Sequence, residues 1–219
     1  MRNLTIATTG GDRLPARLIA GDDAVGIVLA HGAGAGQDHP WMMTIRDGLA
    51  SSAGVTVLTF DYPYMAAGRR APDRPDRLLD AHAAAVARLR QECGSVVLAG
   101  KSMGGRIGSH LAGDRGEDVA GLVYYGYPLV APGKAEPRDV AHLARIVAPQ
   151  LFVAGSRDRL CPTELIRPVV GALPAAELVV VEGADHSFRV AAASGTTTAA
   201  VLAGLVQQTT DWLGRVGLR

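Results

Sequence analysis

The chain has 219 residues, of which 48% are hydrophobic and 20% charged, and its formal net charge is +1. This composition is typical of a globular protein, and the length suits one domain, residues 1–219, with a well-buried core. The near-neutral charge gives no reason to expect nucleic acid or an anionic membrane as a partner, because both call for concentrated positive charge, so we expect a small-molecule substrate.

The N-terminal segment and the cysteines bear on the cellular setting. No apolar run long enough for a signal-peptide core precedes Asp12 and Arg13. Residues 190–210 lack charge, but they are too rich in Gly, Ser, Thr and Gln for a membrane span, which needs about 20 mostly apolar residues. Cys93 and Cys161 lie far apart and match neither a redox nor a zinc motif. We therefore expect a cytoplasmic protein with reduced thiols.

The sequence predicts an N-terminal hairpin followed by six further strands. Residues 3–9 and 14–21 flank the turn signal Gly10-Gly11-Asp12, which predicts a hairpin at a sheet edge. Later apolar runs are rich in Val, Ile and Leu and lack the alternation of a half-exposed strand, so both of their faces are expected to be covered. These runs are residues 26–32, 55–63, 95–102, 120–128, 149–158 and 177–186.

Helical patterns separate these strands. Apolar residues near a 3.6-residue repeat predict a helix over 78–93 that stops at a glycine cap, Gly94. A second pattern, 197–213, predicts the last helix of the chain. Strands that alternate with helices indicate βαβ units, so the expected fold class is α/β, with a mostly parallel central sheet and helices on both faces.

The segment Gly100-Lys101-Ser102-Met103-Gly104 matches the pattern G-x-S-x-G. It follows an apolar strand and precedes a helix-compatible segment, which is the context of a nucleophile elbow. Glycines are needed there because the strand and the helix approach each other closely. We therefore interpret Ser102 as a nucleophile rather than as a structural turn residue.

A serine hydroxyl needs a general base and an acid that orients the base. Asp158 lies just beyond one late strand and His186 beyond the next, which gives the chain order Ser, Asp, His of α/β-hydrolases. Asp185 competes for the acid's role, but it adjoins His186 in sequence, so Asp158 is favoured. The remaining histidines follow no late strand and are interpreted as structural or surface residues: His31, His39, His82, His110 and His142.

An acyl-transfer site also needs donors for the oxyanion. The glycine-rich turn "LAHGAGAG", residues 29–36, follows an early strand and can direct backbone N–H groups toward the strand ends. We predict the N–H groups of Ala33 and Met103 as the oxyanion hole.

Together these motifs resemble the α/β-hydrolase superfamily over essentially the whole chain. Within it, "VLAHGAGAGQDHPWM", "FDYPYM" and "LAGKSMGGR" resemble the small, lidless group related to dienelactone hydrolase, especially the bacterial and eukaryotic testis-expressed α/β-hydrolase-like proteins. Dienelactone hydrolases use a cysteine nucleophile where this chain has Ser102. Some eukaryotic relatives are subunits of chromatin complexes, which implies an alternative, non-catalytic function in binding or complex assembly.

The sequence also indicates the shape of the site. Only residues 129–148 separate two predicted strands at the position where many lipases insert a lid, so we expect no large lid and an open site for small acyl groups. The predicted pocket walls are Trp41, Met42, Tyr127 and Leu129. The favoured function is hydrolysis of a small ester-like substrate through a Ser-His-Asp triad and an acyl-enzyme.

Other polar residues suggest no additional chemistry. The pairs Asp38-His39 and Asp185-His186 lack metal-ligand spacing, and the glycine-rich turn lacks the Gly-Lys-Ser/Thr of a phosphate loop, so neither a metal nor a cofactor is expected. Arg69 and Arg70 either bind an anionic part of a substrate or lie in a solvated loop, and the second interpretation is favoured. Lys101 is left outside the catalytic set.

Overall fold

The fold is organised around one eight-stranded sheet with the strand order β1-β2-β4-β3-β5-β6-β7-β8. The computed structural model describes residues 1–219. The strands are β1 Arg2–Ala7, β2 Arg13–Ile19, β3 Asp22–Ala30, β4 Val55–Phe60, β5 Ser95–Lys101, β6 Gly121–Tyr125, β7 Gln150–Gly155 and β8 Ala176–Val181.

The sheet is mostly parallel, as the sequence predicts. β4, β3, β5, β6, β7 and β8 pair in parallel in that spatial order, whereas β2 is antiparallel to both of its neighbours, β1 and β4. The predicted hairpin is confirmed: β1 and β2 pair with Thr5 opposite Pro15, and Gly11 in their turn has a φ of 83°, a conformation that suits glycine. The hairpin therefore extends one edge of the sheet.

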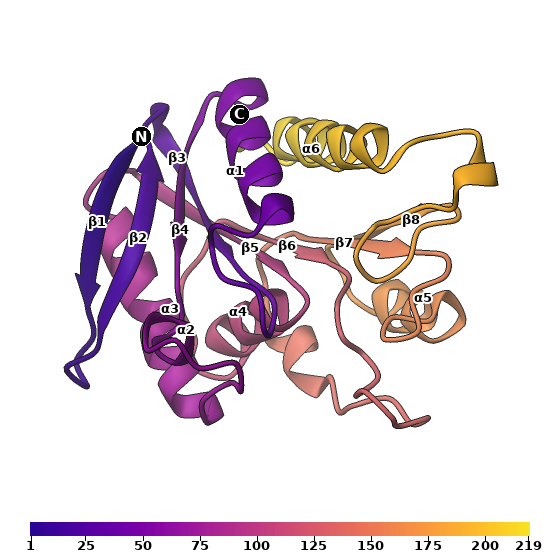
Figure 1. Ribbon diagram of the computed structural model, residues 1–219, viewed down its shortest axis with the longest axis horizontal. Helices are drawn as coiled ribbons and strands as arrows, with labels where there is room; N and C mark the ends of the chain where they lie inside the picture. The colour runs from indigo at the N-terminus through magenta and orange to yellow at the C-terminus, as the bar shows by residue number, and fades with distance from the viewer.

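Helices cover both faces of the sheet (Figure 1). Helices α1 and α6 lie on one face, and α2, α3, α4 and α5 lie on the other. The helices are α1 Pro40–Ser52, α2 Pro63–Ala66, α3 Pro75–Leu89, α4 Met103–Gly113, α5 Thr163–Gly171 and α6 Thr198–Arg215, with short 3-10 turns η1 Ala141–Arg145 and η2 Ala192–Ser194. Residues 126–149, between β6 and β7, hold only loops and η1, so no lid covers the site.

Strand β3 shows why the strands lack an alternation of apolar and polar residues. Ile27 and Leu29 belong to the core under α1 and α6, whereas Val28 and Ala30 belong to the core under the other helices. All four side chains are fully buried. Because each face of the strand meets a helical layer there, the buried positions 25–30 hold only apolar residues and glycine.

The boundaries of α3 differ from the sequence prediction. The helix begins at Pro75, three residues before the expected start, since the fixed φ of proline suits the first helical turn. It ends at Leu89 with Arg90 as its C-cap, so Gly94 is not the cap. The Gly94 N–H instead donates to the Asp23 carbonyl oxygen at 2.9 Å, which fixes the chain before β5 beside the start of β3.

The C-terminal helix and the cysteines match expectation. α6 starts at Thr198, and the Thr197 hydroxyl caps it by accepting from the Ala200 N–H at 3.1 Å. None of the helices combines the length and apolarity that crossing a bilayer requires. Cys93 and Cys161 are both buried and unpaired.

Two buried histidines make the stability of this fold sensitive to acid. Burial lowers the pKa of His82 to about 3 and that of His142 to about 4. Since an unfolded histidine titrates near pH ~6.5, the unfolded chain binds more protons than the folded chain below that pH. The free energy of unfolding is therefore expected to fall as the pH drops from 6 to 4.

We predict that His82→Phe makes this pH dependence shallower by about one proton, or roughly 1.4 kcal/mol per pH unit near pH ~5. Urea unfolding of both proteins at several pH values measures the slope, which is independent of any constant loss of stability in the variant. Equal slopes in the two proteins would contradict the assignment of a neutral, buried His82.

Candidate active site

Ser102 occupies a sharp turn between the end of β5 and the start of α4. Its φ of 50° and ψ of −113° lie in a region that non-glycine residues rarely adopt, which costs about 1–3 kcal/mol. A Cβ on Gly100 would lie 2.2 Å from the Gly105 nitrogen, and one on Gly104 would lie 2.3 Å from the Ala30 carbonyl oxygen. The two glycines of the motif therefore allow the helix to pack against the sheet and leave Ser102 at the helix N-terminus.

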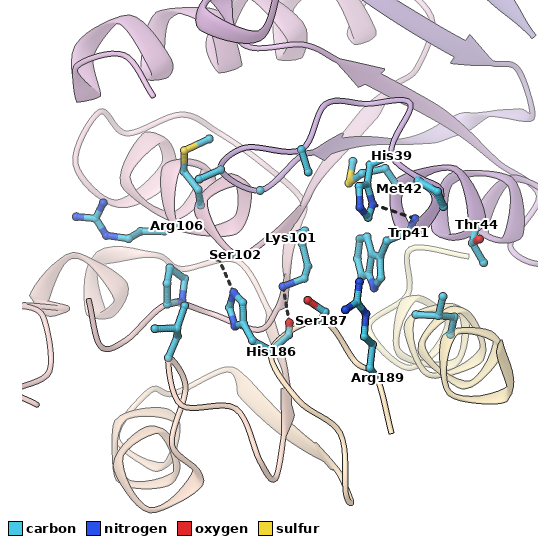
Figure 2. Close-up of a pocket in the computed structure, with 18 of the residues that line it drawn as sticks. His39, Trp41, Met42, Thr44, Lys101, Ser102, Arg106, His186, Ser187 and Arg189 are labelled. Carbon is cyan, nitrogen blue, oxygen red and sulfur yellow. Dashed lines mark hydrogen bonds between the residues drawn. The ribbon is translucent and has the colours of Figure 1, made fainter. Parts of the chain in front are cut away.

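The structure brings Ser102, His186 and Asp158 together from three separate strand ends. His186 Nε2 lies 2.9 Å from Ser102 Oγ, and His186 Nδ1 lies 2.8 Å from Asp158 Oδ2. Figure 2 shows the His186 ring facing Ser102. This geometry fits a tautomer in which Nδ1 donates to the carboxylate and Nε2 accepts from the serine hydroxyl.

The two candidate acids have different surroundings. Asp158 is buried after β7, and its Oδ1 accepts from the N–H groups of Leu160 at 2.8 Å and Cys161 at 3.2 Å. Its other oxygen is thereby aimed at His186. The Asp185 carboxylate accepts from two backbone N–H groups of its own loop, those of Ser187 and Arg189. Asp158 contacts the histidine ring, and Asp185 shapes the loop that carries it.

Lys101 anchors the loop that carries His186. Its Nζ donates to the His186 carbonyl oxygen at 2.6 Å and lies 6.0 Å from the centre of the Trp41 ring and 5.7 Å from that of Phe188. Figure 2 shows the hydrogen bond from Lys101 to His186. Burial lowers the pKa of Lys101 to about 8. Lys101 lies outside the catalytic set predicted from the sequence, whereas in the structure it fixes the backbone of His186.

The glycine-rich turn after β3 lies beside Ser102. A Cβ on Gly32 would lie 3.6 Å from Ser102 Cβ, so the turn approaches the elbow closely. His31 fixes the turn: its Nδ1 lies 2.8 Å from the Gly32 carbonyl oxygen, and its Nε2 accepts from the Tyr62 N–H. The N–H groups of Ala33 and Met103 have no acceptor within the protein, and both residues line the adjacent cavity.

A cavity of about 640 Å³ opens over Ser102 and His186. Trp41 and Met42 line it, as predicted. The prediction that Tyr127 and Leu129 are pocket walls is wrong, because both are buried in the core between the sheet and α4.

The turn after β6 explains this correction. Gly126, with a φ of 66°, redirects the chain after the strand. The Tyr127 ring then packs edge-on against Tyr124 with ring centres 5.3 Å apart, and its hydroxyl lies 3.3 Å from His142 Nε2. The cavity is lined by the neighbouring Pro128 instead.

The cavity walls also include arginines that the sequence analysis did not select: Arg106, Arg138 and Arg189. Arg106 lies four residues after Ser102 and Arg189 three after His186, so closeness to the motifs could have indicated both. Nothing in the sequence pattern indicates Arg138.

Arg69 and Arg70 lie outside the cavity, whereas His39, which the sequence indicated as a structural or surface residue, lines it. Arg69 pairs with Asp73 at 2.7 Å and Arg70 is exposed, which confirms that they belong to a solvated loop. No three His, Cys, Asp or Glu side chains are grouped as metal ligands would be.

Comparison with known proteins identifies the family. The model of the alpha/beta hydrolase domain matches residues 23–214. The chain belongs to the α/β-hydrolase family. This match covers the elbow, the glycine-rich turn and the strand ends that carry Asp158 and His186.

Solved α/β-hydrolase structures share the fold over nearly the full length. An alpha-beta serine hydrolase homologue from Coxiella burnetii is similar with a TM-score of 0.75 and 19% identity, covering 97% of each chain. A lidless serine hydrolase from Xanthomonas campestris gives 0.74 and 18%, covering 96% of this chain and 94% of its own. A dienelactone hydrolase from Anabaena variabilis gives 0.75 and 22%, covering 98% and 96%. At these identities the likeness establishes the fold.

The close approach at this α/β-hydrolase elbow predicts a large effect of a single methyl group. Gly104→Ala would place a Cβ against the backbone of β3, which cannot move without disturbing the sheet. We expect a loss of about 1–3 kcal/mol in the free energy of unfolding, measured by denaturant titration.

Gly204→Ala is the matched control, because a Cβ at this position of α6 meets no atom within 4 Å. It should be neutral or stabilise the protein by up to about 1 kcal/mol, since alanine favours helix. Wild-type stability in Gly104→Ala would contradict the packing described for the elbow.

Proposed function

We propose that the protein is a serine hydrolase that cleaves small carboxylic esters through an acyl-enzyme. The observation that carries this proposal is the hydrogen-bonded chain from Asp158 through His186 to Ser102, with contacts of 2.8 and 2.9 Å, at the wall of the cavity. An activated serine with an oriented base is the arrangement that acyl transfer requires.

The first half-reaction forms the acyl-enzyme. Ser102 Oγ attacks the ester carbonyl while His186 Nε2 accepts its proton, and Asp158 stabilises the imidazolium through Nδ1. The N–H groups of Ala33 and Met103 are free to donate to the oxyanion. When the intermediate collapses, His186 gives the proton to the leaving alcohol.

The second half-reaction releases the acid. Water enters through the open side of the cavity, and His186 takes its proton as the water attacks the acyl carbonyl. The same N–H groups hold the second oxyanion, and the proton returns to Ser102 Oγ as the acid leaves. His186 carries every proton transfer in the cycle, and the water supplies the hydroxyl of the acid and the proton that restores Ser102.

The volume of the cavity and the absence of a lid support a small substrate. The cavity of about 640 Å³ is bounded by Trp41, Met42 and Leu202 on its apolar side, and no lid extends it. The similarity to structures named a dienelactone hydrolase and a lidless serine hydrolase is consistent with ester chemistry in such a site.

We predict that Ser102→Ala lowers kcat/KM for p-nitrophenyl acetate by about a millionfold, because the remaining groups cannot replace the nucleophile. Asp158→Ala should lower it by roughly ten-thousandfold, since the histidine stays but loses its orientation and charge partner. Initial rates followed by nitrophenolate absorbance measure both effects.

Ser51→Ala serves as the control for contaminating esterases, because Ser51 is exposed on α1 and donates only to the Asp47 carbonyl oxygen. Equal turnover by wild type and Ser102→Ala would eliminate the serine mechanism and favour a non-catalytic binding protein.

A further inference from the structure

The charge on the cavity wall is one-sided. Four cationic side chains line the cavity, those of Lys101, Arg106, Arg138 and Arg189, and no aspartate or glutamate does. Lys101 is occupied by the His186 carbonyl oxygen. The three arginines form no ion pair within the protein, and their guanidinium groups make no hydrogen bond to it.

Ten arginines elsewhere in this molecule form ion pairs, and the seven that do not are all exposed, whereas Arg106 and Arg138 are half-buried. Arg77 holds both Asp12 and Asp73, Arg115 holds Asp80, and comparable pairs recur over the surface. The chain therefore has carboxylates with which to neutralise arginines, yet none is placed at this cavity. Its net charge of +1 shows that the imbalance is local rather than general.

Arg106 is fixed next to the reacting groups. It lies in the first turn of α4, where its N–H donates to the Ser102 carbonyl oxygen at 3.1 Å. Figure 2 shows Arg106 on one side of Ser102 and His186, with Trp41 and Arg189 on the other. Burial lowers the pKa of Arg106, Tyr127 opposes this shift, and the charge of Arg138 lowers the pKa further.

Arg138 is brought to the same wall by a loop with fixed ends. Val130 and Pro137 form an antiparallel bridge, the Arg138 N–H donates to the Leu129 carbonyl oxygen at 2.8 Å, and the Val130 N–H donates to that of Leu160 at 2.9 Å. The Arg138 Nε is buried and has no hydrogen-bond partner. A buried donor without an acceptor destabilises the protein, and a ligand oxygen that accepts from it would remove this cost.

Two neighbouring guanidinium groups with free donors match one type of ligand group. Guanidinium presents its N–H groups in a planar fork that binds carboxylate or phosphate oxygens in pairs, and a shared anion removes the repulsion between the two cations. The two arginines cannot relieve this repulsion by losing a proton, because arginine stays charged in proteins.

We propose that Arg106 and Arg138 form an anion subsite, so that the preferred substrate is an ester that also carries a carboxylate or phosphate group. The proposal rests on the hydrolase function proposed above. The anion lies on the Arg106 side of the cavity and thereby orients the ester carbonyl over Ser102. The apolar wall at Trp41 then faces the uncharged part of the substrate.

Matched esters test this subsite directly. Monomethyl adipate and methyl hexanoate have the same chain length and differ in a terminal carboxylate, and a pH-stat follows the hydrolysis of both. We expect wild type to prefer monomethyl adipate in kcat/KM by at least about tenfold, and both Arg106→Gln and Arg138→Gln to reduce that ratio by about tenfold or more. Arg138 lies in a loop apart from α4, so its variant tests the subsite independently of the elbow.

Arg70→Gln is the matched control, because it removes the same charge from an exposed loop residue outside the cavity. Its preference ratio should stay within roughly twofold of wild type, since a distant exposed charge is screened by salt. An unchanged ratio in both Arg106→Gln and Arg138→Gln, or a wild type without preference, would overturn the subsite while leaving the hydrolase function intact.

Binding without turnover separates the subsite from the hydrolase function. Isothermal titration of Ser102→Ala with adipate and with inorganic phosphate reports which anion binds, and adding Arg106→Gln should weaken the tighter one by at least about tenfold. Adipate binding supports a carboxylate subsite and phosphate binding a phosphate subsite. Binding of neither overturns the proposal, whereas Arg106-dependent binding with no ester turnover by wild type would overturn only the hydrolase function.

Discussion

The close contact between the end of β5 and the first turn of α4 is the constraint on which the site depends. The helix can approach β5 only because position 100 carries no Cβ, and it can approach the end of β3 only because position 104 carries none. Ser102 takes up the turn with a strained φ of 50°. Packing of α4 against the sheet over its whole length holds this strain of about 1–3 kcal/mol in place. Ser102 is thus positioned by the hydrophobic core together with its backbone hydrogen bonds, in which its N–H donates to the Tyr125 carbonyl oxygen at 2.9 Å and its carbonyl oxygen accepts from the Arg106 N–H at 3.1 Å.

The other site groups are held by buried polar contacts at neighbouring strand ends. Two backbone N–H groups hold the Asp158 carboxylate in place, and the Lys101 ammonium fixes the His186 loop by donating to the His186 carbonyl oxygen. Lowering the pKa of Lys101 from 10.5 to about 8 corresponds to about 3 kcal/mol against its charged form. The charges of Asp158 and Asp185 oppose this shift, and the Lys101 ammonium also contacts the His186 carbonyl oxygen and the Trp41 and Phe188 rings. The unpaired arginines of the cavity have no such internal compensation.

The sequence predicts the architecture and the reacting groups well because both are encoded locally. Apolar runs without alternation mark doubly covered strands, and G-x-S-x-G marks a turn whose sterics demand glycine at two positions. Asp158 and His186 could be predicted as partners of Ser102 because the carboxyl ends of parallel strands lie at one edge of the sheet. The predicted boundaries of α3 are wrong at both ends. Pro75 starts the helix earlier than expected, and the Gly94 N–H donates to β3 rather than capping the helix.

What the sequence could not give is the direction of side chains in irregular segments. Tyr127 and Leu129 follow a strand end as catalytic residues do, but the turn at Gly126 sends them into the core. Arg138 reaches the cavity only because a loop closes through the Val130–Pro137 bridge, and no periodicity or spacing encodes that closure. Specificity in this fold therefore depends on loop geometry, whereas catalytic potential depends on strand ends.

If Ser102 is the activated nucleophile that we propose, a fluorophosphonate should react with it. Proteolysis and mass spectrometry of the peptide that contains residue 102 then locate the adduct. We expect one phosphonyl adduct, located on Ser102, that forms at least about a hundredfold more slowly in His186→Ala because the general base is gone. An unmodified Ser102, or modification at a rate independent of His186, would contradict the proposal.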